Sequence, residues 1–169
     1  DVITINAEDV KAVKNNCHTI EYYRSKDSAR TINVRISHGA PYLLNGTAYA
    51  DCTASDLMKD RTKLVLTETD GDSEYDVLNI ITYDVMLLSS AAVAGRKLHN
   101  QYTFDDKLDV LDLSEYKDEN VLIYRDGVKS ELSGLMSGDV ISVYKTPKGI
   151  DGIIRIYADS SSFNGNVDM

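Results

Sequence analysis

The sequence is poor in several residue types, and each shortage excludes a class of structure. Its 169 residues include no tryptophan and only two phenylalanines, two prolines and two cysteines. No apolar run approaches the ~18 residues that a membrane-spanning helix needs, so we expect no membrane insertion. The cysteines do not form a Cys-x-x-Cys pair, which excludes the usual zinc and dithiol motifs. We therefore expect Cys17 and Cys52 to be either two buried free thiols or one disulfide.

Positive charge is also scarce. The chain carries 18 Lys and Arg against 27 Asp and Glu, which gives a net charge of −9 at pH 7. An acidic surface repels phosphate backbones, so we expect no nucleic-acid partner. The negative charge serves either solubility or, more specifically, binding of a divalent cation.

Tyrosine is abundant, and the apolar residues follow the period of β-strands. There are 11 tyrosines, a residue that suits half-exposed strand positions. Residues 30–37 alternate, with Ile32, Val34 and Ile36 on one face, which predicts a half-buried antiparallel strand. Asn45-Gly46 and Asp126-Gly127 are strong hairpin-turn signals. The pattern predicts a mainly β protein.

An internal repeat organises the chain. Residues 62–83 predict two strands joined by a glycine-containing turn, and residues 139–157 repeat this pattern. Leu57-Met58, in a helical turn that Ser55 is expected to cap, precedes the first copy, and Leu135-Met136 precedes the second. We predict two related small antiparallel β-barrel or β-sandwich modules in tandem, a first module at 1–92 and a second at 93–169. Gly138 would supply the bulged strand entry typical of small barrels.

Three stretches of the chain resemble a known class of module. They are TETDGDSEYDVLNIITY, LSGLMSGDVISVYKTPKGIDGIIRIY and the ending FNGNVDM. They resemble β-modules of large secreted or cell-wall-attached surface proteins of clostridial-type Gram-positive bacteria, which often also carry S-layer homology segments. The resemblance implies an extracellular or cell-wall-associated location and a non-catalytic role as spacer or scaffold. No S-layer homology segment lies within this chain, and such surface proteins usually avoid cysteine.

The two ends of the sequence bear on its expected partners. The first residues, DVITINAEDV, contain neither the basic nor the apolar region of a secretory signal. Val167, near Met169, is expected to start a further strand. We therefore expect a fragment of a longer polypeptide, whose partners are the neighbouring domains of the same chain.

The first copy of the repeat has an acidic turn. Its acids stand at alternating positions, and they are Asp70, Asp72, Glu74 and Asp76. Calcium binds several converging carboxylate oxygens, which such spacing in a loop can supply. Tyr75 and Ile81 stand where an EF-hand would need Gly and Glu, so the turn is not an EF-hand. It is either a solvated hairpin tip or a calcium site, and calcium titration followed by melting temperature would decide.

No catalytic motif is present in the sequence. His18, His38 and His99 lie in different predicted elements, without His-x-His or His-Glu-x-x-His spacing. No serine elbow, dinucleotide fingerprint or phosphate-binding loop occurs. Cys17 and His18 are adjacent, and in a strand they would point to opposite faces. We expect no enzyme activity, no catalytic residue, no cofactor and no metal ligand.

Tyrosines remain as candidate binding residues. A planar face of tyrosines would stack against polysaccharide, whereas single tyrosines are ordinary strand residues. The candidates in the first module are Tyr22, Tyr23, Tyr42 and Tyr49, and those in the second are Tyr124, Tyr144 and Tyr157. The sequence thus predicts a structural module, with a carbohydrate- or cell-wall-binding module as the alternative and cell-wall polysaccharide as its partner.

Overall fold

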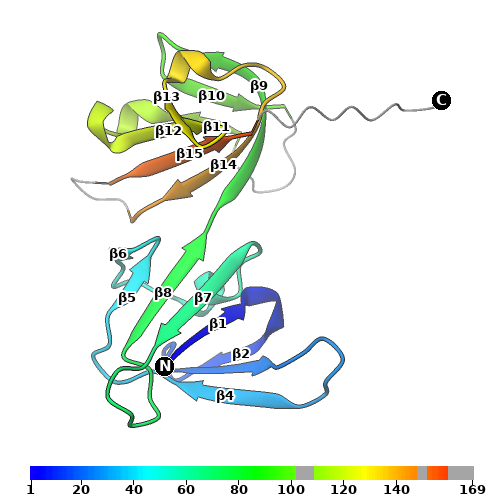
Figure 1. The fold of residues 1–169 in the computed structure, drawn as a ribbon, viewed down its shortest axis with the longest axis vertical. Helices are drawn as coiled ribbons and strands as arrows, with labels where there is room; N and C mark the ends of the chain where they lie inside the picture. The colour runs from blue at the N-terminus through cyan, green and yellow to red at the C-terminus, as the bar shows by residue number, and fades with distance from the viewer. Residues whose placement is uncertain (102–108, 148–151, 160–169) are drawn as a thin grey trace, which may run out of the picture. The chain divides into compact units, whose positions relative to one another are not determined.

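The fold is taken from a computed structural model that describes residues 1–101, 109–147 and 152–159 (Figure 1). The described chain is mainly β, as predicted. Its contacts divide it into two compact units. Of the described residues, unit 1 contains 1–83 and 145–147, and unit 2 contains 84–101, 109–144 and 152–159.

Unit 1 consists of short strands and two short helical turns. The strands are β1 (Val2–Asn6), β2 (Val10–Lys14), β3 (Thr19–Tyr23), β4 (Thr31–Arg35), β5 (Tyr42–Leu44), β6 (Thr47–Ala48), β7 (Thr62–Thr67) and β8 (Val77–Thr82). The helical turns are η1 (Ala7–Asp9) and α1 (Ala54–Leu57). Figure 1 shows β1, β7 and β8 side by side.

A five-stranded sheet in the order β1-β7-β8-β5-β6 forms one layer of unit 1. β7 and β8 form the predicted hairpin, in which Leu64 pairs with Ile80. The hairpin β5–β6 turns at Asn45-Gly46, where both residues have positive φ, 49° and 84°. Asparagine and glycine tolerate this left-handed conformation better than other residues, so the Asn45-Gly46 pair correctly predicted a hairpin turn.

The second sheet of unit 1 has the order β2-β3-β4 and is antiparallel. Alternation places Ile20 of β3 and Val34 of β4 on the buried face, as the pattern of residues 30–37 predicted. One core contains residues of both sheets. Its buried members are Ile5, Val10, Cys17, Ile20, Val34, Ile36, Leu57, Leu64, Leu66, Leu78 and Ile80.

Unit 2 contains the remaining strands and three 3₁₀ turns. The strands are β9 (Asp84–Ala92), β10 (Lys97–Asn100), β11 (Val110–Asp112), β12 (Val121–Arg125), β13 (Val128–Ser130), β14 (Val140–Lys145) and β15 (Ile154–Ala158). The 3₁₀ turns are η2 (Leu113–Glu115), η3 (Asp118–Asn120) and η4 (Leu132–Gly134).

These strands form one sheet in the order β11-β10-β9-β14-β15-β12-β13. Arg125, at the end of β12, donates to the carbonyl of Gly134 at 2.9 Å and pairs with the carboxylate of Asp139, which precedes β14. The core of unit 2 lies on the face of the sheet that carries every second residue of β14 and β15. Its buried members are Met86, Leu88, Leu98, Leu111, Leu113, Ile123, Leu135, Ile141, Val143, Ile154, Ile156 and Ala158.

Two features of the predicted architecture were wrong. No sheet among the described residues closes into a barrel, because each ends in edge strands, such as β1 and β6 in the five-stranded sheet. Gly138, with φ +90°, does provide a turn before β14, but this does not close the sheet. The sheets are also not purely antiparallel, because β5 pairs with β8, and β12 with β15, in parallel.

Several local expectations can now be placed. The expected module boundary after residue 92 falls at the end of β9, whereas the two units divide between Tyr83 and Asp84. Residues 89–100, around this expected boundary, are largely strand, in β9 and β10. The strand expected near Val167 lies outside the described residues. No helix in the described parts of the chain has the length and apolar character to cross a membrane.

The N-cap of α1 is Thr53, not Ser55. The carboxylate of Asp56 accepts hydrogen bonds from the backbone N–H of Thr53 at 2.7 Å and from its hydroxyl at 2.9 Å. Thr53 therefore stands before the first helical residue, and Ser55 lies within the turn. The sequence contained this signal, since a threonine followed three residues later by an acid is a variant of the capping box.

Candidate functional site

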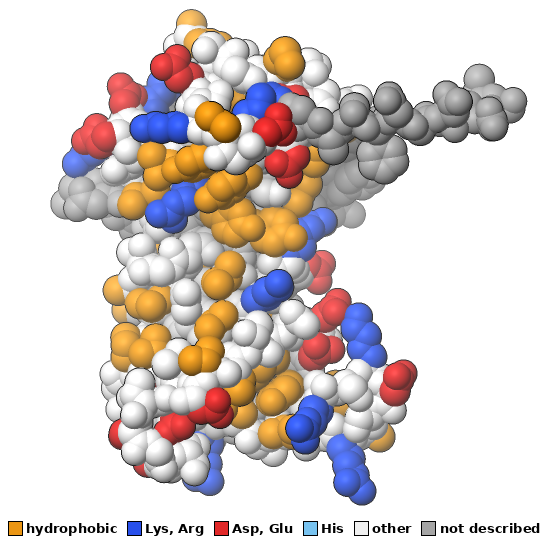
Figure 2. All heavy atoms as spheres, in the orientation of Figure 1, with side chains coloured by type: hydrophobic (Ala, Val, Ile, Leu, Met, Phe, Trp, Pro, Cys, Tyr) orange, Lys and Arg blue, Asp and Glu red, His pale blue; other side chains and the backbone are white. Residues whose placement is uncertain are grey.

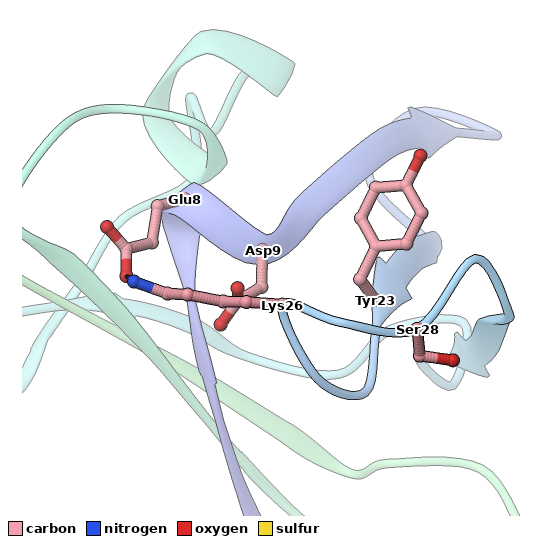
Figure 3. A pocket seen from close by; sticks show the side chains of 5 residues that line it. All are labelled: Glu8, Asp9, Tyr23, Lys26 and Ser28. Carbon is pink, nitrogen blue, oxygen red and sulfur yellow. Dashed lines mark ion pairs between the residues drawn. The ribbon is translucent and has the colours of Figure 1, made fainter.

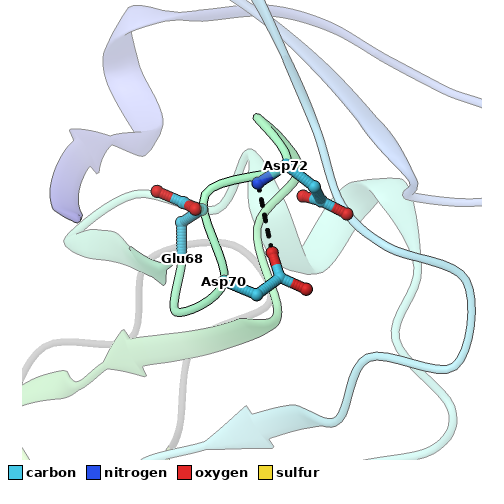
Figure 4. Close-up of side chains that lie close together, drawn as sticks. All are labelled: Glu68, Asp70 and Asp72. Atoms are coloured by element: carbon cyan, nitrogen blue, oxygen red, sulfur yellow. Dashed lines mark hydrogen bonds between the residues drawn. The ribbon is translucent and has the colours of Figure 1, made fainter.

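The acidic turn between β7 and β8 brings three carboxylates together. One carboxylate oxygen from each of Glu68, Asp70 and Asp72 lies within 4.8 Å of the other two (Figure 4). Asp70 and Asp72 were predicted members of this group, while Glu68 was missed. Glu68 extends the same alternation one step back, to the residue that follows β7, so the signal was available in the sequence. This is the only group of three or more such ligands in the described part of the chain.

The acidic side chains of this turn accept hydrogen bonds from the backbone of the turn itself. The backbone N–H of Asp72 donates to Asp70 Oδ1 at 3.2 Å, and that of Glu74 donates to Asp72 Oδ1 at 2.8 Å. The carboxylate of Glu68 accepts from the N–H of Gly71, whose φ is +81°. Each carboxylate therefore satisfies a backbone donor that a tight turn would otherwise expose to solvent.

Asp76 lies apart from the three clustered acids. Its Oδ2 accepts from the backbone N–H of Thr69 at 2.7 Å and from the Thr69 hydroxyl at 2.6 Å. These hydrogen bonds to the Thr69 side chain and backbone stabilise the charged form and lower the pKa of Asp76. Of the four predicted acids, Asp76 closes the hairpin, and Asp70 and Asp72 offer oxygens suited to a hard cation such as calcium.

A second constellation lies in unit 1, beside the β2–β3 turn. An open cavity of about 530 Å³ is lined by His18, Tyr42, Tyr49 and Cys52, among others. The ring centroids of His18 and His38 are 4.7 Å apart. The expectation that these histidines are separate was therefore wrong, because the loop after β4 returns His38 to the start of β3. His99 is on β10 of unit 2, away from this pair along the chain.

The two cysteines meet beside this cavity. Cys17 Sγ lies 3.8 Å from the carbonyl oxygen of Cys52, and Cys17 is buried in the core of unit 1. Cys17 lies in a turn rather than in a strand, with φ +68°. It and His18 still face different surroundings, since Cys17 is buried in the core and His18 lines the cavity. Both thiols are free in this structure.

Burial raises the pKa of several groups around the cavity. Desolvation is the main cause for Tyr42, Cys17 and Cys52. The upward shift of the Cys17 pKa is opposed by a hydrogen bond with the Cys52 thiol. Tyr42 donates its hydroxyl proton to the carbonyl of Cys17 at 2.8 Å. These groups therefore stay protonated at neutral pH, which is the reverse of what a thiolate nucleophile needs.

The tyrosines separate into two kinds of position. Tyr22, Tyr42 and Tyr49 pack against the core of unit 1, so they form no exposed planar face. In unit 2, Tyr124 and Tyr157 are opposite each other in the parallel pair of β12 and β15. Their rings stack with centroids 5.3 Å apart and planes at 14°.

Tyr144 completes this aromatic cluster. Its ring meets that of Tyr157 edge-on, at 5.6 Å and 86°. Strand alternation turns Tyr124 and Tyr157 away from the buried Ile123 and Ile156, so the cluster lies on the face of the sheet opposite the core. Figure 2 shows hydrophobic side chains gathered over β12, β14 and β15 on this face. We call Tyr124, Tyr144 and Tyr157 the tyrosine platform.

The surface of unit 1 also has a shallow polar hollow of about 340 Å³. It is lined by Glu8, Asp9, Tyr23, Lys26 and Ser28 (Figure 3). Lys26 Nζ lies 2.9 Å from Glu8 Oε1, and both side chains are largely exposed, at 76% and 62%. Exposed pairs of this kind contribute little to stability, and the hollow contains no further cluster that would do chemistry.

Comparison with known proteins identifies no relative of this chain. No protein-family model matches it, and neither a curated protein nor a solved structure matches it.

Proposed function

We propose that the chain is a non-catalytic structural module of an extracellular bacterial surface protein, acting as a spacer or scaffold between neighbouring domains. The observation that carries the proposal is a repeated strand arrangement. Unit 1 has the order β1-β7-β8-β5-β6, and the sheet of unit 2 contains β9-β14-β15-β12-β13. In unit 1, β8 pairs in parallel with β5, the first strand of the hairpin β5–β6. In unit 2, β15 pairs in parallel with β12, the first strand of the hairpin β12–β13.

Local details support the view that the two units are tandem copies of one module. The turns Asn45-Gly46 and Asp126-Gly127 have nearly the same φ angles, 49° and 84° against 50° and 78°. The N–H of Asn45 donates to Ile80 O, and that of Asp126 donates to Ala158 O, at 2.8 and 3.0 Å. These contacts align the two turns residue for residue.

The chain passes between the two units more than once, and the first of these connections suits a spacer. Only Tyr83 separates β8 from β9, and each unit has a hydrophobic core of its own. A module with its own hydrophobic core can fold independently, and a passive spacer needs no assembled site beyond that. The net charge of −9 keeps such a chain soluble outside the cell.

Force spectroscopy on the full chain tests the spacer proposal. Two tandem modules should unfold in two separate events, each releasing about 30 nm of extended chain at the length per residue of a stretched polypeptide. A single event that releases the whole chain at once would contradict independent modules.

The tyrosine platform favours a second function, a carbohydrate- or cell-wall-binding module. Stacked, half-exposed tyrosines present flat apolar faces with polar edges, which suits the faces of sugar rings. Tyr157 is the most open of the three, with 37% of its surface exposed. Arg155 lies on the same face of β15, two residues before Tyr157, and would add hydrogen-bond donors.

A sedimentation assay with purified cell-wall polysaccharide separates the two functions. A binding module should bind saturably and lose most of that binding in Tyr157→Ala and Tyr124→Ala, while Tyr157→Phe retains the ring. Tyr23→Ala, in the polar hollow of unit 1, is the matched control and should bind like wild type. If wild type does not bind, the spacer function stands alone.

A further inference from the structure

Cys17 and Cys52, which are 35 positions apart in sequence, are neighbours in unit 1. Cys17 Sγ lies 3.8 Å from the carbonyl oxygen of Cys52. Cys17 is 5% exposed and belongs to the core, and Cys52 packs against the same core. The folded chain therefore holds two cysteines side by side.

The backbone around Cys17 is held in an unusual conformation. Asn15, Asn16 and Cys17 have φ angles of 53°, 51° and 68°, in the left-handed region. Asparagine visits this region readily, whereas cysteine does so rarely. The turn is fixed by the N–H of His18, which donates to Asn15 O at 3.0 Å, and by the Tyr42 hydroxyl on Cys17 O. This turn directs the Cys17 side chain into the core, where it meets Cys52.

The two thiols differ in their access to small molecules. Cys52 lines the open cavity of about 530 Å³, together with His18 and Tyr42. Cys17 does not line it and is buried. A low-molecular-weight disulfide entering the cavity would therefore meet Cys52 before it met the buried Cys17.

We propose that Cys17 and Cys52 form a redox pair that closes to an intramolecular disulfide when the chain meets an oxidising low-molecular-weight disulfide. The Cys52 thiolate attacks the reagent disulfide, forming a mixed disulfide and expelling one reagent thiolate. The Cys17 thiolate then attacks the Cys52 sulfur and expels the second reagent thiolate. The protein loses two protons and two electrons, and the reagent disulfide is reduced to two thiols.

The bond would link separate parts of unit 1. Cys17 belongs to the turn between β2 and β3, in the three-stranded sheet, and Cys52 precedes α1, between β6 and β7 of the five-stranded sheet. Closing a loop of this size removes freedom from the unfolded chain, which stabilises the folded state. The device is independent of the spacer or carbohydrate function proposed above.

The environment also determines how fast the pair should react. Only thiolates attack disulfides, and burial raises the pKa of both cysteines above the usual value. Exchange should therefore be slow at pH 7 and accelerate by up to about tenfold per pH unit in the alkaline direction. A metal site is not favoured here, since the only group of three or more metal ligands in the described residues is the acidic turn.

The test treats the reduced full chain with excess oxidised glutathione at alkaline pH, followed by intact-mass and peptide analysis. We expect the mass to fall by two hydrogens, a Cys17–Cys52 linked peptide, and a melting temperature higher by roughly 10 °C. Dithiothreitol should reverse all three changes. A stable glutathione adduct on wild type, a disulfide between two chains, or no reaction without denaturant would overturn the proposal.

Two variants resolve the order of attack. Cys17→Ser should accumulate glutathione on Cys52, because the resolving thiol is missing. Cys52→Ser should remain unmodified while folded, because Cys17 is buried. Equal glutathionylation of both variants would contradict the assigned roles. If either variant fails to fold, the linked peptide and the pH dependence of its formation in wild type still decide whether the pair closes.

Discussion

At the scale of single residues, the carboxylate of Glu21 in unit 1 is held by three hydrogen bonds. Its carboxylate accepts from Lys14 Nζ at 2.7 Å, from Lys11 Nζ at 3.1 Å and from the Thr31 hydroxyl at 2.9 Å. These groups come from β2 and β4, on either side of β3. The hydrogen bonds, first that of Lys14, lower the pKa of Glu21 to about 2. One carboxylate thus ties together all three strands of the second sheet.

The lowered pKa of Glu21 predicts a specific pH dependence of stability. A carboxyl group with a depressed folded-state pKa contributes stability above its unfolded pKa of 4.5, and this is lost as the pH falls toward about 2. Glu21→Gln should therefore melt several degrees below wild type at pH 7, with the gap closing as the pH falls through this window. Thermal melts across the pH range measure the gap.

The control for Glu21 is Glu8→Gln. Glu8 also pairs with a lysine, Lys26, but both side chains are largely exposed, so the variant should melt close to wild type at every pH. If the Glu21→Gln and wild-type curves run parallel from pH 7 to acid, the three contacts do not stabilise the fold.

Contacts between side chains that are far apart in sequence could not be predicted from the sequence alone. Cys17 meets Cys52, and His18 meets His38, because a turn and a loop return the chain to the same place. Neither pair has a spacing that signals contact, since the path between its members depends on sheet packing. The platform residues Tyr124, Tyr144 and Tyr157 were foreseen as strand residues, but their stacking depends on a parallel register set by distant segments.

At the scale of elements, the acidic turn acts first as a hairpin closure. Asp76 accepts two hydrogen bonds from Thr69 across the turn, and Asp76 N–H donates to Thr67 O at 2.8 Å. Asp70 instead accepts one, at 3.2 Å, from a residue two positions on. Because Asp76 accepts more and shorter hydrogen bonds than Asp70, we expect Asp76 to contribute more to the stability of the β7–β8 hairpin.

This ranking predicts that Asp76→Ala lowers the melting temperature by a few degrees and that Asp70→Ala has almost no effect. The physical reason is that Asp76→Ala leaves the N–H and hydroxyl of Thr69 without their acceptor, while Asp70→Ala exposes only one N–H to water. Thermal denaturation of both variants at pH 7 measures the difference. Equal melting temperatures would show that the turn closes without Asp76.

A similar contrast concerns α1. Asp56 accepts from the N–H and hydroxyl of Thr53 and from the Tyr49 hydroxyl at 3.3 Å, so one carboxylate caps the helical turn and anchors Tyr49. Asp56→Ala should cost about 1–2 kcal/mol of unfolding free energy, the usual cost of a lost cap. Ser55→Ala, at the residue expected from the sequence to be the cap, should cost much less. Denaturant titration of the two variants measures the loss of unfolding free energy. A larger loss for Ser55→Ala than for Asp56→Ala would show that Ser55 is the cap.

The strands and turns were largely predictable from the sequence. The hairpin pairings were predictable as well, but the parallel pairings were not. Alternation at residues 31–35 and the Asn45-Gly46 turn are local signals, and both gave the expected structure. The parallel pairing of β5 with β8 has no local signal, because it depends on the crossover through α1. Sequence patterns therefore identified the strands and hairpins. They predicted antiparallel barrels or sandwiches, whereas the sheets are not closed into barrels and are not purely antiparallel.

At the scale of the whole molecule, the central question is whether the two units are stable independently. Leu64 pairs with Ile5 and Ile80 in unit 1, and Ile141 pairs with Met86 in unit 2. Both side chains are completely buried, each in the core of its own unit. Truncating one of them therefore perturbs one core and leaves the other intact.

We predict that Leu64→Ala and Ile141→Ala each cost about 2–5 kcal/mol, the usual cost of such a cavity, and that each cost is confined to one unit. Hydrogen exchange measured by mass spectrometry should show faster exchange in β1, β7 and β8 for Leu64→Ala, with β12 and β15 unchanged. Ile141→Ala should show the reverse. Val65→Ala and Ser142→Ala, on the opposite faces of the same strands, are the matched controls and should perturb exchange far less. Faster exchange in both units from either core variant would mean that they unfold as one cooperative body, which tandem spacer modules should not do.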